Sequence, residues 1–141
     1  MGALRAAKIQ YQLIGMSAAL LQGVPVATFD VDLWINLPVR QYMLAAKVAM
    51  ANGAQMVRNT VFELTDGTLV NFIFEVDGLK SFAVELRKAR KLRFHGQTVP
   101  VMPLESIRRS KAAVMRPKDS SHIHSIDETL RLLRAKGKSK L

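Results

Sequence analysis

The sequence predicts a single α+β domain, residues 1–141, in which a mixed β-sheet is flanked by helices. The chain has 141 residues, which is enough for one sizeable core and too few for two. Runs that alternate like strands are interspersed with runs that have helical periodicity, and neither an internal repeat nor a linker separates them. An apolar fraction of 49% and a mean hydropathy of +0.09 are typical of a folded domain.

Hydrophobic periodicity and turn residues together define the expected elements. In chain order these are a strand at 8–14, a helix at 16–21, a strand at 29–35, a helix at 38–52, strands at 57–64 and 69–76, a helix at 79–89, strands at 92–95 and 98–101, and helices at 103–115 and 119–135. The basic segment 136–141 is expected to be a flexible tail.

Glycine and proline mark the ends of the elements in the first half of the chain. The loosely alternating run at 8–14 leads into Gly15, and the Ala-rich helix that follows stops at Gly23-Val-Pro. Pro38 is suited to the start of a helix, and Gly53 is suited to its end. The first strand begins so close to Met1 that we expect no helix before it, unless a partner subunit supplies one.

Turn residues also divide the second half. Asp66-Gly67 between two β-rich runs is a strong hairpin signal, and Gly96 suggests a second hairpin. Pro117 separates the two closing helices. Asp119 has the chemistry of an N-cap for the second of them.

The positive charge is concentrated in one half of the sequence. Residues 1–80 carry six basic and six acidic side chains, whereas residues 81–141 carry fifteen basic and five acidic ones, so that the second half holds the whole net charge of +10. This asymmetry favours a polyanionic partner, such as a nucleoside triphosphate, RNA or an acidic protein. For the tail that begins at Lys136, a solvated surface is the simpler interpretation.

Several classes of protein are excluded or disfavoured by composition. The chain has no cysteine, hence no disulfide, thiolate metal site or cysteine nucleophile. No apolar run approaches the roughly 18 residues of a membrane-spanning helix, and the N-terminal residues lack the layout of a signal peptide. We therefore expect no membrane association and a cytoplasmic location. Association of the chain with copies of itself is left open.

The carboxylates Asp30 and Asp32 are the main candidates for chemistry. Strict alternation along 29–35 places Asp30, Asp32 and Trp34 on one face of the predicted strand. Two carboxylates so close together repel each other unless a cation compensates them, and Mg²⁺ favours carboxylate oxygens while leaving positions open for phosphate. Without its flanks, the pair is equally compatible with a solvated strand face. Phe29, Trp34 and the preceding Gly15-Met-Ser favour a metal and phosphate site.

Two segments resemble a known family. The first is Leu13-Ile-Gly-Met-Ser-Ala-Ala-Leu-Leu-Gln-Gly-Val-Pro-Val-Ala-Thr-Phe-Asp-Val-Asp-Leu, and the second runs from Val101-Met-Pro-Leu-Glu-Ser-Ile to Arg116-Pro-Lys-Asp-Ser-Ser-His-Ile. They lie some eighty residues apart, in the order found in the minimal nucleotidyltransferases of the polymerase-beta-like superfamily. The sequence is most similar to the AbiEii-type and related uncharacterised bacterial proteins, and this resemblance covers nearly the whole chain.

The resemblance implies a nucleotidyltransferase-like fold and a set of site residues. Asp30 and Asp32 would be metal ligands, Gly15 and Ser17 would contact phosphate, and the basic residues Lys111 and Lys118 would contact the nucleotide. Arg108, one turn before Lys111, is expected to face the same cleft. From the residues alone, a surface lysine of an amphipathic helix is the preferred interpretation of Lys111. Asp119 is an N-cap by its local chemistry and a cleft residue by the resemblance.

Three positions depart from the family pattern. The third carboxylate of the superfamily corresponds to Asn71, which cannot act as a base, and the displaced Glu75 and Asp77 are poor substitutes. Val26 stands where an arginine is expected. Met16 replaces a small residue and is expected to crowd the approach of phosphate.

Two functions follow from this pattern. The first is an Mg²⁺-dependent nucleotidyltransferase that transfers NMP from an NTP to an acceptor hydroxyl. The alternative is a catalytically inactive relative that binds a nucleotide or nucleic acid, and either one is compatible with a toxin–antitoxin pair.

Overall fold

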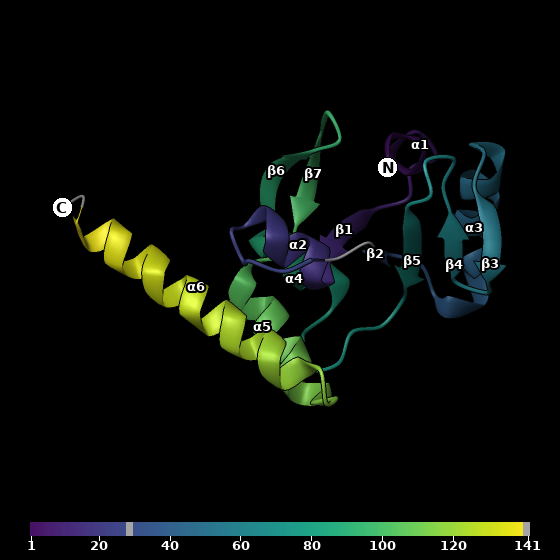
Figure 1. The fold of residues 1–141 in the computed structure, drawn as a ribbon. Helices are drawn as coiled ribbons and strands as arrows, with labels where there is room; N and C mark the ends of the chain where they lie inside the picture. Colours follow the sequence, from purple (N-terminus) through teal and green to yellow (C-terminus); the bar gives the residue numbers. More distant parts are fainter. Residues whose placement is uncertain (28–29, 140–141) are drawn as a thin grey trace.

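A mixed sheet of seven strands forms the centre of the computed structural model, which describes residues 1–27 and 30–139 (Figure 1). The strands are β1 (Tyr11–Ile14), β2 (Asp30–Ile35), β3 (Gln55–Arg58), β4 (Val61–Glu63), β5 (Leu69–Ile73), β6 (Arg90–Phe94) and β7 (Gln97–Val101). Their order across the sheet is β3-β4-β5-β2-β1-β7-β6. The predicted α+β class with a mixed sheet is therefore confirmed.

Strand β2 lies in the middle of the sheet and is paired on both sides. It runs antiparallel to β1 and parallel to β5. In this register Asp32 lies opposite Ile14 on β1 and beside Asn71 on β5. The sheet thus joins three segments that are distant in sequence at the candidate carboxylates.

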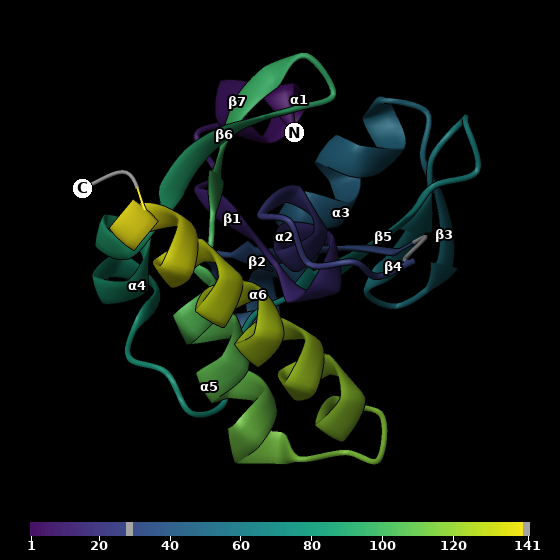
Figure 2. The ribbon, with the colours of Figure 1, turned by 60° about the vertical axis from the view of Figure 1, so that its left-hand side comes forward.

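Helices flank the sheet and differ greatly in length. They are α1 (Gly2–Ala6), α2 (Gly15–Leu21), the 3-10 helix η1 (Val39–Gln41), α3 (Tyr42–Ala51), α4 (Phe82–Lys88), α5 (Leu104–Val114) and α6 (Asp119–Ser139). Figure 2 shows α5 and α6 packed side by side, and Figure 1 shows the far end of α6 extending beyond the rest of the fold. No helix of the described residues is long and apolar enough to cross a membrane.

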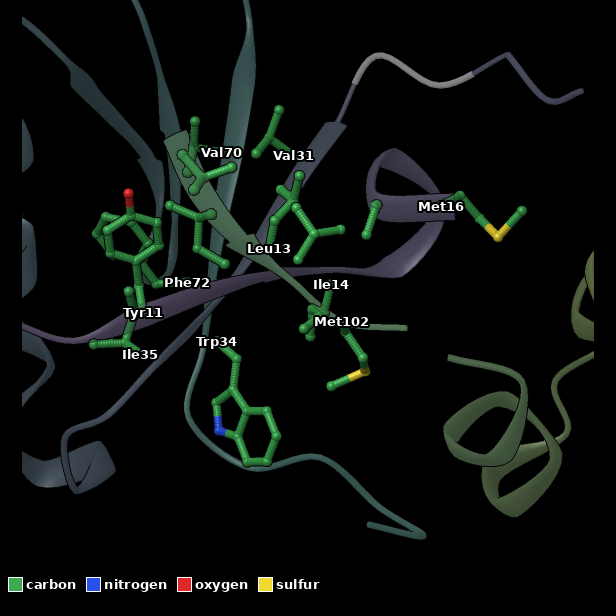
Figure 3. Packing of buried hydrophobic residues seen from close by; sticks show 14 of the residues in the cluster. Tyr11, Leu13, Ile14, Met16, Val31, Trp34, Ile35, Val70, Phe72 and Met102 are labelled. Carbon is green, nitrogen blue, oxygen red and sulfur yellow. The ribbon is translucent and has the colours of Figure 1, made fainter. Parts of the chain in front are cut away.

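The core occupies both faces of the central strands. All four residues of β1 are buried. Trp34, which shares a strand face with Asp32, packs edge-on against Phe82 of α4, with 5.3 Å between ring centroids. Figure 3 shows Trp34 on the opposite side of β1 from Val31 and Val70. Helix α4 therefore covers the Trp34 end of this face, and only the aspartate end is left open.

Several predicted boundaries differ from the structure. The run at 57–64, predicted as one strand, contains the end of β3, a turn at Asn59-Thr60 and β4. Helix α1 precedes β1, where the sequence predicted none; five residues suffice because Leu4 anchors them in the core. Helix α6 continues to Ser139, past the predicted end at residue 135 and into the segment expected to be a tail. Phe29 and residues 140–141 lie outside the described residues.

Gly78 is the position where the loop after β5 crosses α5 most closely. An added Cβ would lie 2.6 Å from the Cβ of Ala113 and 3.1 Å from the carbonyl oxygen of Arg109, at a φ of +76°. Gly67, in the β4–β5 turn, has a similar φ of +88° but no atom within 4 Å of its added Cβ. Both glycines therefore adopt a left-handed backbone conformation, but only Gly78 also lacks room for a side chain.

We predict that Gly78→Ala destabilises the fold more than Gly67→Ala. Both substitutions cost about 1–2 kcal/mol through the left-handed backbone, and Gly78→Ala adds about 1–3 kcal/mol because it forces α5 away. Urea denaturation of the two variants measures the difference. Equal free energies of unfolding would contradict the close crossing.

Candidate nucleotide-binding cleft

The two aspartates project from the open end of β2. Asp30 is exposed at the start of the strand, and Asp32 is half-buried two residues later on the same face. Because β2 is central, Asp32 is surrounded by backbone on both sides, whereas Asp30 borders solvent. A ligand can therefore approach the pair from the Asp30 side.

Gly15 holds the backbone of α2 directly against Asp32. The helix begins at Gly15, whose φ is +70°, immediately after the residue that pairs with Asp32 in the sheet. A Cβ at Gly15 would lie only 2.5 Å from Oδ2 of Asp32. Any larger residue would displace the carboxylate, so glycine is required here for two independent reasons.

Asn71 and Thr60 orient the inner carboxylate from the other side. The Thr60 hydroxyl donates a hydrogen bond of 3.1 Å to Oδ1 of Asn71, and the side chain of Asn71 is hydrogen-bonded to Asp32. With its oxygen engaged by Thr60, the Asn71 amide presents its N–H groups to Asp32. Asn71, which occupies the position where the resemblance implies a third carboxylate, therefore donates a hydrogen bond to Asp32.

Asp32 carries a charge that its surroundings do not fully compensate. Burial raises the pKa of Asp32, and the neighbouring charge of Asp30 raises it further. Lys111, the hydrogen bond from Asn71 and Lys118 act in the opposite direction without cancelling the shift. A bound cation would offset the repulsion between these two carboxylates and favour the ionised form of Asp32.

The closing helices bring a buried ion pair toward this carboxylate. Lys111 on α5 is 9% exposed, and its Nζ lies 3.5 Å from Oδ1 of Asp119, which is fully buried at the start of α6. Burial lowers the pKa of Lys111, while Asp119 counteracts that shift. Lys111 is thus held in place by Asp119 and is near enough to Asp32 to lower the pKa of its carboxyl group.

Groups in the turn before α6 stabilise the ionised carboxylate of Asp119. It accepts a hydrogen bond of 2.8 Å from the backbone N–H of Arg116. Burial raises its pKa, but this hydrogen bond and the charges of Lys111 and Arg116 outweigh burial, so the pKa lies below its ordinary value. Asp119 therefore positions Lys111 and is more than a helix cap.

A cavity of about 380 Å³ adjoins the outer carboxylate. Asp30, Ser17, Thr68 and His95 are among the residues that line it. The Ser17 side chain is buried, and its hydroxyl donates a 3.3 Å hydrogen bond to the carbonyl of Ile14. The loop of the β4–β5 hairpin and the tip of the β6–β7 hairpin form the far wall, which the sequence patterns alone did not place here.

Two expectations from the sequence, for Arg108 and Met16, do not match the structure, whereas the poor position expected for Glu75 does. Arg108 does not face the cleft, because it forms an exposed two-point ion pair with Asp127 of α6, with Nε–Oδ1 and Nη2–Oδ2 distances of 2.6 and 3.3 Å. Met16 is buried in the core (Figure 3), so its side chain does not crowd the opening. Glu75 follows the end of β5 and lines a hollow beside Trp34, away from the aspartates.

The residues at the cleft fit a hard divalent cation with two protein ligands. Among residues 1–27 and 30–139, no group of three or more His, Asp or Glu side chains is arranged to hold a metal. Asp30 and Asp32 supply carboxylate oxygens, and the Gly15 backbone leaves space beside Oδ2. Mg²⁺ commonly takes one or two carboxylates and completes its octahedron with water and substrate phosphates.

The architecture is that of the nucleotidyltransferases. Neither a protein-family model nor a curated protein matches the sequence. The fold is instead similar to solved structures of the polymerase-beta-like class, at low sequence identity. The mixed sheet of seven strands with its flanking helices thus has a nucleotidyltransferase-like fold.

Three of these structures show the extent of the likeness. The lincosamide antibiotic adenylyltransferase LnuA, lincomycin-bound, has a TM-score of 0.55 and 10% identity over 89% of this chain and 90% of its own. ANT(2″)-Ia in complex with adenylyl-2″-tobramycin has a TM-score of 0.57 and 17% identity, over 99% and 92%. A nucleotidyltransferase-fold protein from Thermotoga maritima has a TM-score of 0.57 and 22% identity, over 96% and 88%.

We predict that Asp119→Asn destabilises the protein by about 3–5 kcal/mol, because it leaves Lys111 buried and unpaired. Asp127→Asn is the matched control, since it breaks an exposed ion pair between the same two helices and should change stability little. Thermal and urea unfolding at neutral pH compare the two variants.

The pH dependence of the free energy of unfolding tests the role of Asp119 in a second way. The depressed pKa of Asp119 contributes stability that is present above its unfolded-state value and is lost as pH falls through its folded-state value. This loss of stability at acid pH should be smaller in Asp119→Asn than in the wild type, and unchanged in Asp127→Asn. Equal losses of stability in the two variants would show that the Lys111–Asp119 pair has no special role.

Proposed function

We propose that this protein is an Mg²⁺-dependent nucleotidyltransferase that binds an NTP at the Asp30/Asp32 cleft and transfers NMP to an acceptor hydroxyl. The observation that carries the proposal is the position of Asp32. It lies between the Gly15 backbone and Asn71, within electrostatic reach of Lys111 and Lys118, in a nucleotidyltransferase fold. A solvated strand face would not need a half-buried carboxylate with a raised pKa.

Asp30 and Asp32 would hold the metal in this reaction. When bound, Mg²⁺ would neutralise triphosphate charge and favour ionisation of the acceptor hydroxyl. The acceptor hydroxyl loses its proton to solvent and its oxygen forms a bond to the α-phosphorus. The bond from that phosphorus to the bridging oxygen of the β-phosphate breaks, and pyrophosphate leaves. The hydrogen bond from Asn71 lowers the pKa of Asp32 and so favours its ionised form, against burial and the charge of Asp30, which raise it.

Cationic and backbone groups would bind the triphosphate. Lys111 is held by Asp119 and cannot swing away, which makes it a fixed counter-charge for the leaving pyrophosphate. Lys118 is exposed and acts on Asp32 from the same side. Gly15 leaves room for a phosphate oxygen beside its N–H. Ser17 contributes by fixing the start of α2 through its bond to Ile14.

Asn71 is the residue that separates the two candidate functions. Its N–H groups face Asp32, so it offers no base for the acceptor proton at this position. A slow transferase, or an acceptor that ionises readily, fits this arrangement. The second candidate is a protein that binds Mg²⁺–NTP without transfer, and Asn71 is the observation that favours it.

The acceptor that we propose is a small hydroxylated molecule. LnuA and ANT(2″)-Ia are antibiotic-modifying proteins by name, and a small hydroxylated acceptor would suit the cavity beside Asp30. RNA or a protein hydroxyl is the alternative suggested by the basic charge. Membership of the AbiEii-type group, a toxin–antitoxin role and self-association belong to the same set of proposals.

Calorimetric titration of NTPs with and without Mg²⁺ tests the cleft. We predict metal-dependent binding that falls at least about tenfold in Asp30→Asn and in Asp32→Asn, because each removes a ligand oxygen charge. Asp32→Asn should not lower the melting temperature, since the raised pKa means that the ionised side chain disfavours the fold at neutral pH. Binding that is unchanged in both variants would refute the metal role.

A transfer assay with Asn71→Asp distinguishes the two functions. We predict that this variant transfers labelled NMP about 10²–10⁴-fold faster, because it supplies a general base. Without Mg²⁺ it should be less stable than the wild type, since a third carboxylate then faces Asp32. If NTP binds and neither the wild type nor Asn71→Asp transfers, the protein is a nucleotide-binding module and the proposed transfer is wrong.

A further inference from the structure

A second basic surface lies at the β6 edge of the sheet. We call it the basic groove and define it by four exposed cations: Arg5 on α1, Lys8 in the α1–β1 turn, and Lys91 and Arg93 on β6. Arg5, Lys8 and Lys91 line a hollow of about 880 Å³, and Arg93 lies two residues further along the same strand as Lys91. No aspartate or glutamate is among the described residues that line the hollow. Folding thus places two cations of the N-terminal segment beside the basic strand β6.

The two arginines of the groove both donate hydrogen bonds to Thr98 of β7. Arg5 donates from Nη2 to the carbonyl of Thr98 at 2.9 Å, and Arg93 donates from Nη1 to its hydroxyl at 3.4 Å. Lys91 lies two residues before Arg93 and so projects from the same face of the edge strand. Figure 2 shows α1 next to the β6–β7 hairpin. Three chain segments therefore fix positive charge along one groove.

Lys8 has a backbone conformation that its side chain does not favour. Helix α1 ends in a Schellman motif, with bonds of 2.9 Å from Ile9 N–H to Leu4 and from Lys8 N–H to Arg5. Lys8 occupies the left-handed position of that motif at a φ of +60°, where glycine is preferred by about 1 kcal/mol. Within the described residues its ammonium group has no hydrogen bond or ion pair. Its charge is retained at a cost to the fold.

The composition of the groove favours nucleic acid over a protein partner. Protein interfaces depend on a desolvated apolar centre with aromatic or large aliphatic anchors. The apolar residues that line the hollow, such as Ile9, Leu86 and Pro100, are buried or half-buried. The large exposed apolar side chains of the described residues, such as Leu44, Met56 and Leu132, all lie on other elements. Interfaces with nucleic acid are instead rich in cations that contact phosphates, and arginine and lysine alternate here at fixed positions.

We propose that the basic groove binds the sugar-phosphate backbone of single-stranded nucleic acid. Arg5, Lys8, Lys91 and Arg93 contact the phosphates, and the polymer lies along the β6 edge. This site is separate from the aspartate cleft and does not depend on the proposed transfer reaction.

Fluorescence anisotropy with a labelled oligo-U RNA of about 20 nucleotides tests the groove, because single-strand sites cover about 4–16 nucleotides. The test variant combines Lys8→Gly and Lys91→Gln, and its matched control combines Lys47→Gln and Arg58→Gln, which removes the same charge from exposed positions on α3 and β3. Lys8→Gly suits the backbone at this site and should leave the melting temperature unchanged or raised. Loss of folding therefore cannot imitate loss of binding.

We expect the groove variant to bind RNA about 20-fold more weakly at about 0.1 M salt. The slope of the logarithm of the binding constant against the logarithm of the salt concentration should be shallower by about 0.7 for each lost phosphate contact. The control variant should bind like the wild type. A matching oligo-dT shows whether the groove distinguishes RNA from DNA. Unchanged binding in the groove variant, equal losses in both variants, or binding of polyglutamate in place of both oligonucleotides would overturn the proposal.

Discussion

The half-buried carboxylate of Asp32 is the constraint around which the rest of the site is arranged. Its strand, β2, is central, so the space for the side chain is set by β1 on one side and β5 on the other. Gly15 has no Cβ because that atom would collide with Asp32, and Asn71 is turned so that it donates to it. An apolar residue at position 32 would have been easier to bury. Retention of a charge there indicates a ligand-binding role.

The closing helices meet the electrostatic demand that Asp32 creates. A flexible surface lysine would compensate it poorly, because water would screen the charge and the side chain would lose entropy on binding. Lys111 avoids both problems because Asp119 holds it in a buried ion pair at the α5–α6 junction. Long-range cooperation of this kind explains why a motif some eighty residues from the aspartates contributes to the same cleft.

Local patterns predicted the elements well and their side-chain partners poorly. The hairpin at Asp66-Gly67, the Gly15 turn and the β2 alternation were predicted correctly because each depends on neighbouring residues. The full burial of Asp119 and the contact of Thr60 with Asn71 depend on how distant segments pack, which no local rule encodes. Arg108 was misplaced for the same reason: helical spacing put it within one turn of Lys111, but pairing with Asp127 decides its direction. Helix α1 was missed because five residues carry too little periodicity.

Folding also changes what the charge asymmetry of the sequence means. Along the chain the excess positive charge lies in one half, yet in space part of it is gathered at two separate places. Lys111 and Lys118 act on Asp32, whereas Lys91 and Arg93 lie at the far edge of the sheet with Arg5 and Lys8 from the neutral half. A single polyanion-binding half would place these cations together. Their separation agrees with the two proposals, in which a compact, metal-bound phosphate group would bind at one set and an extended polymer at the other.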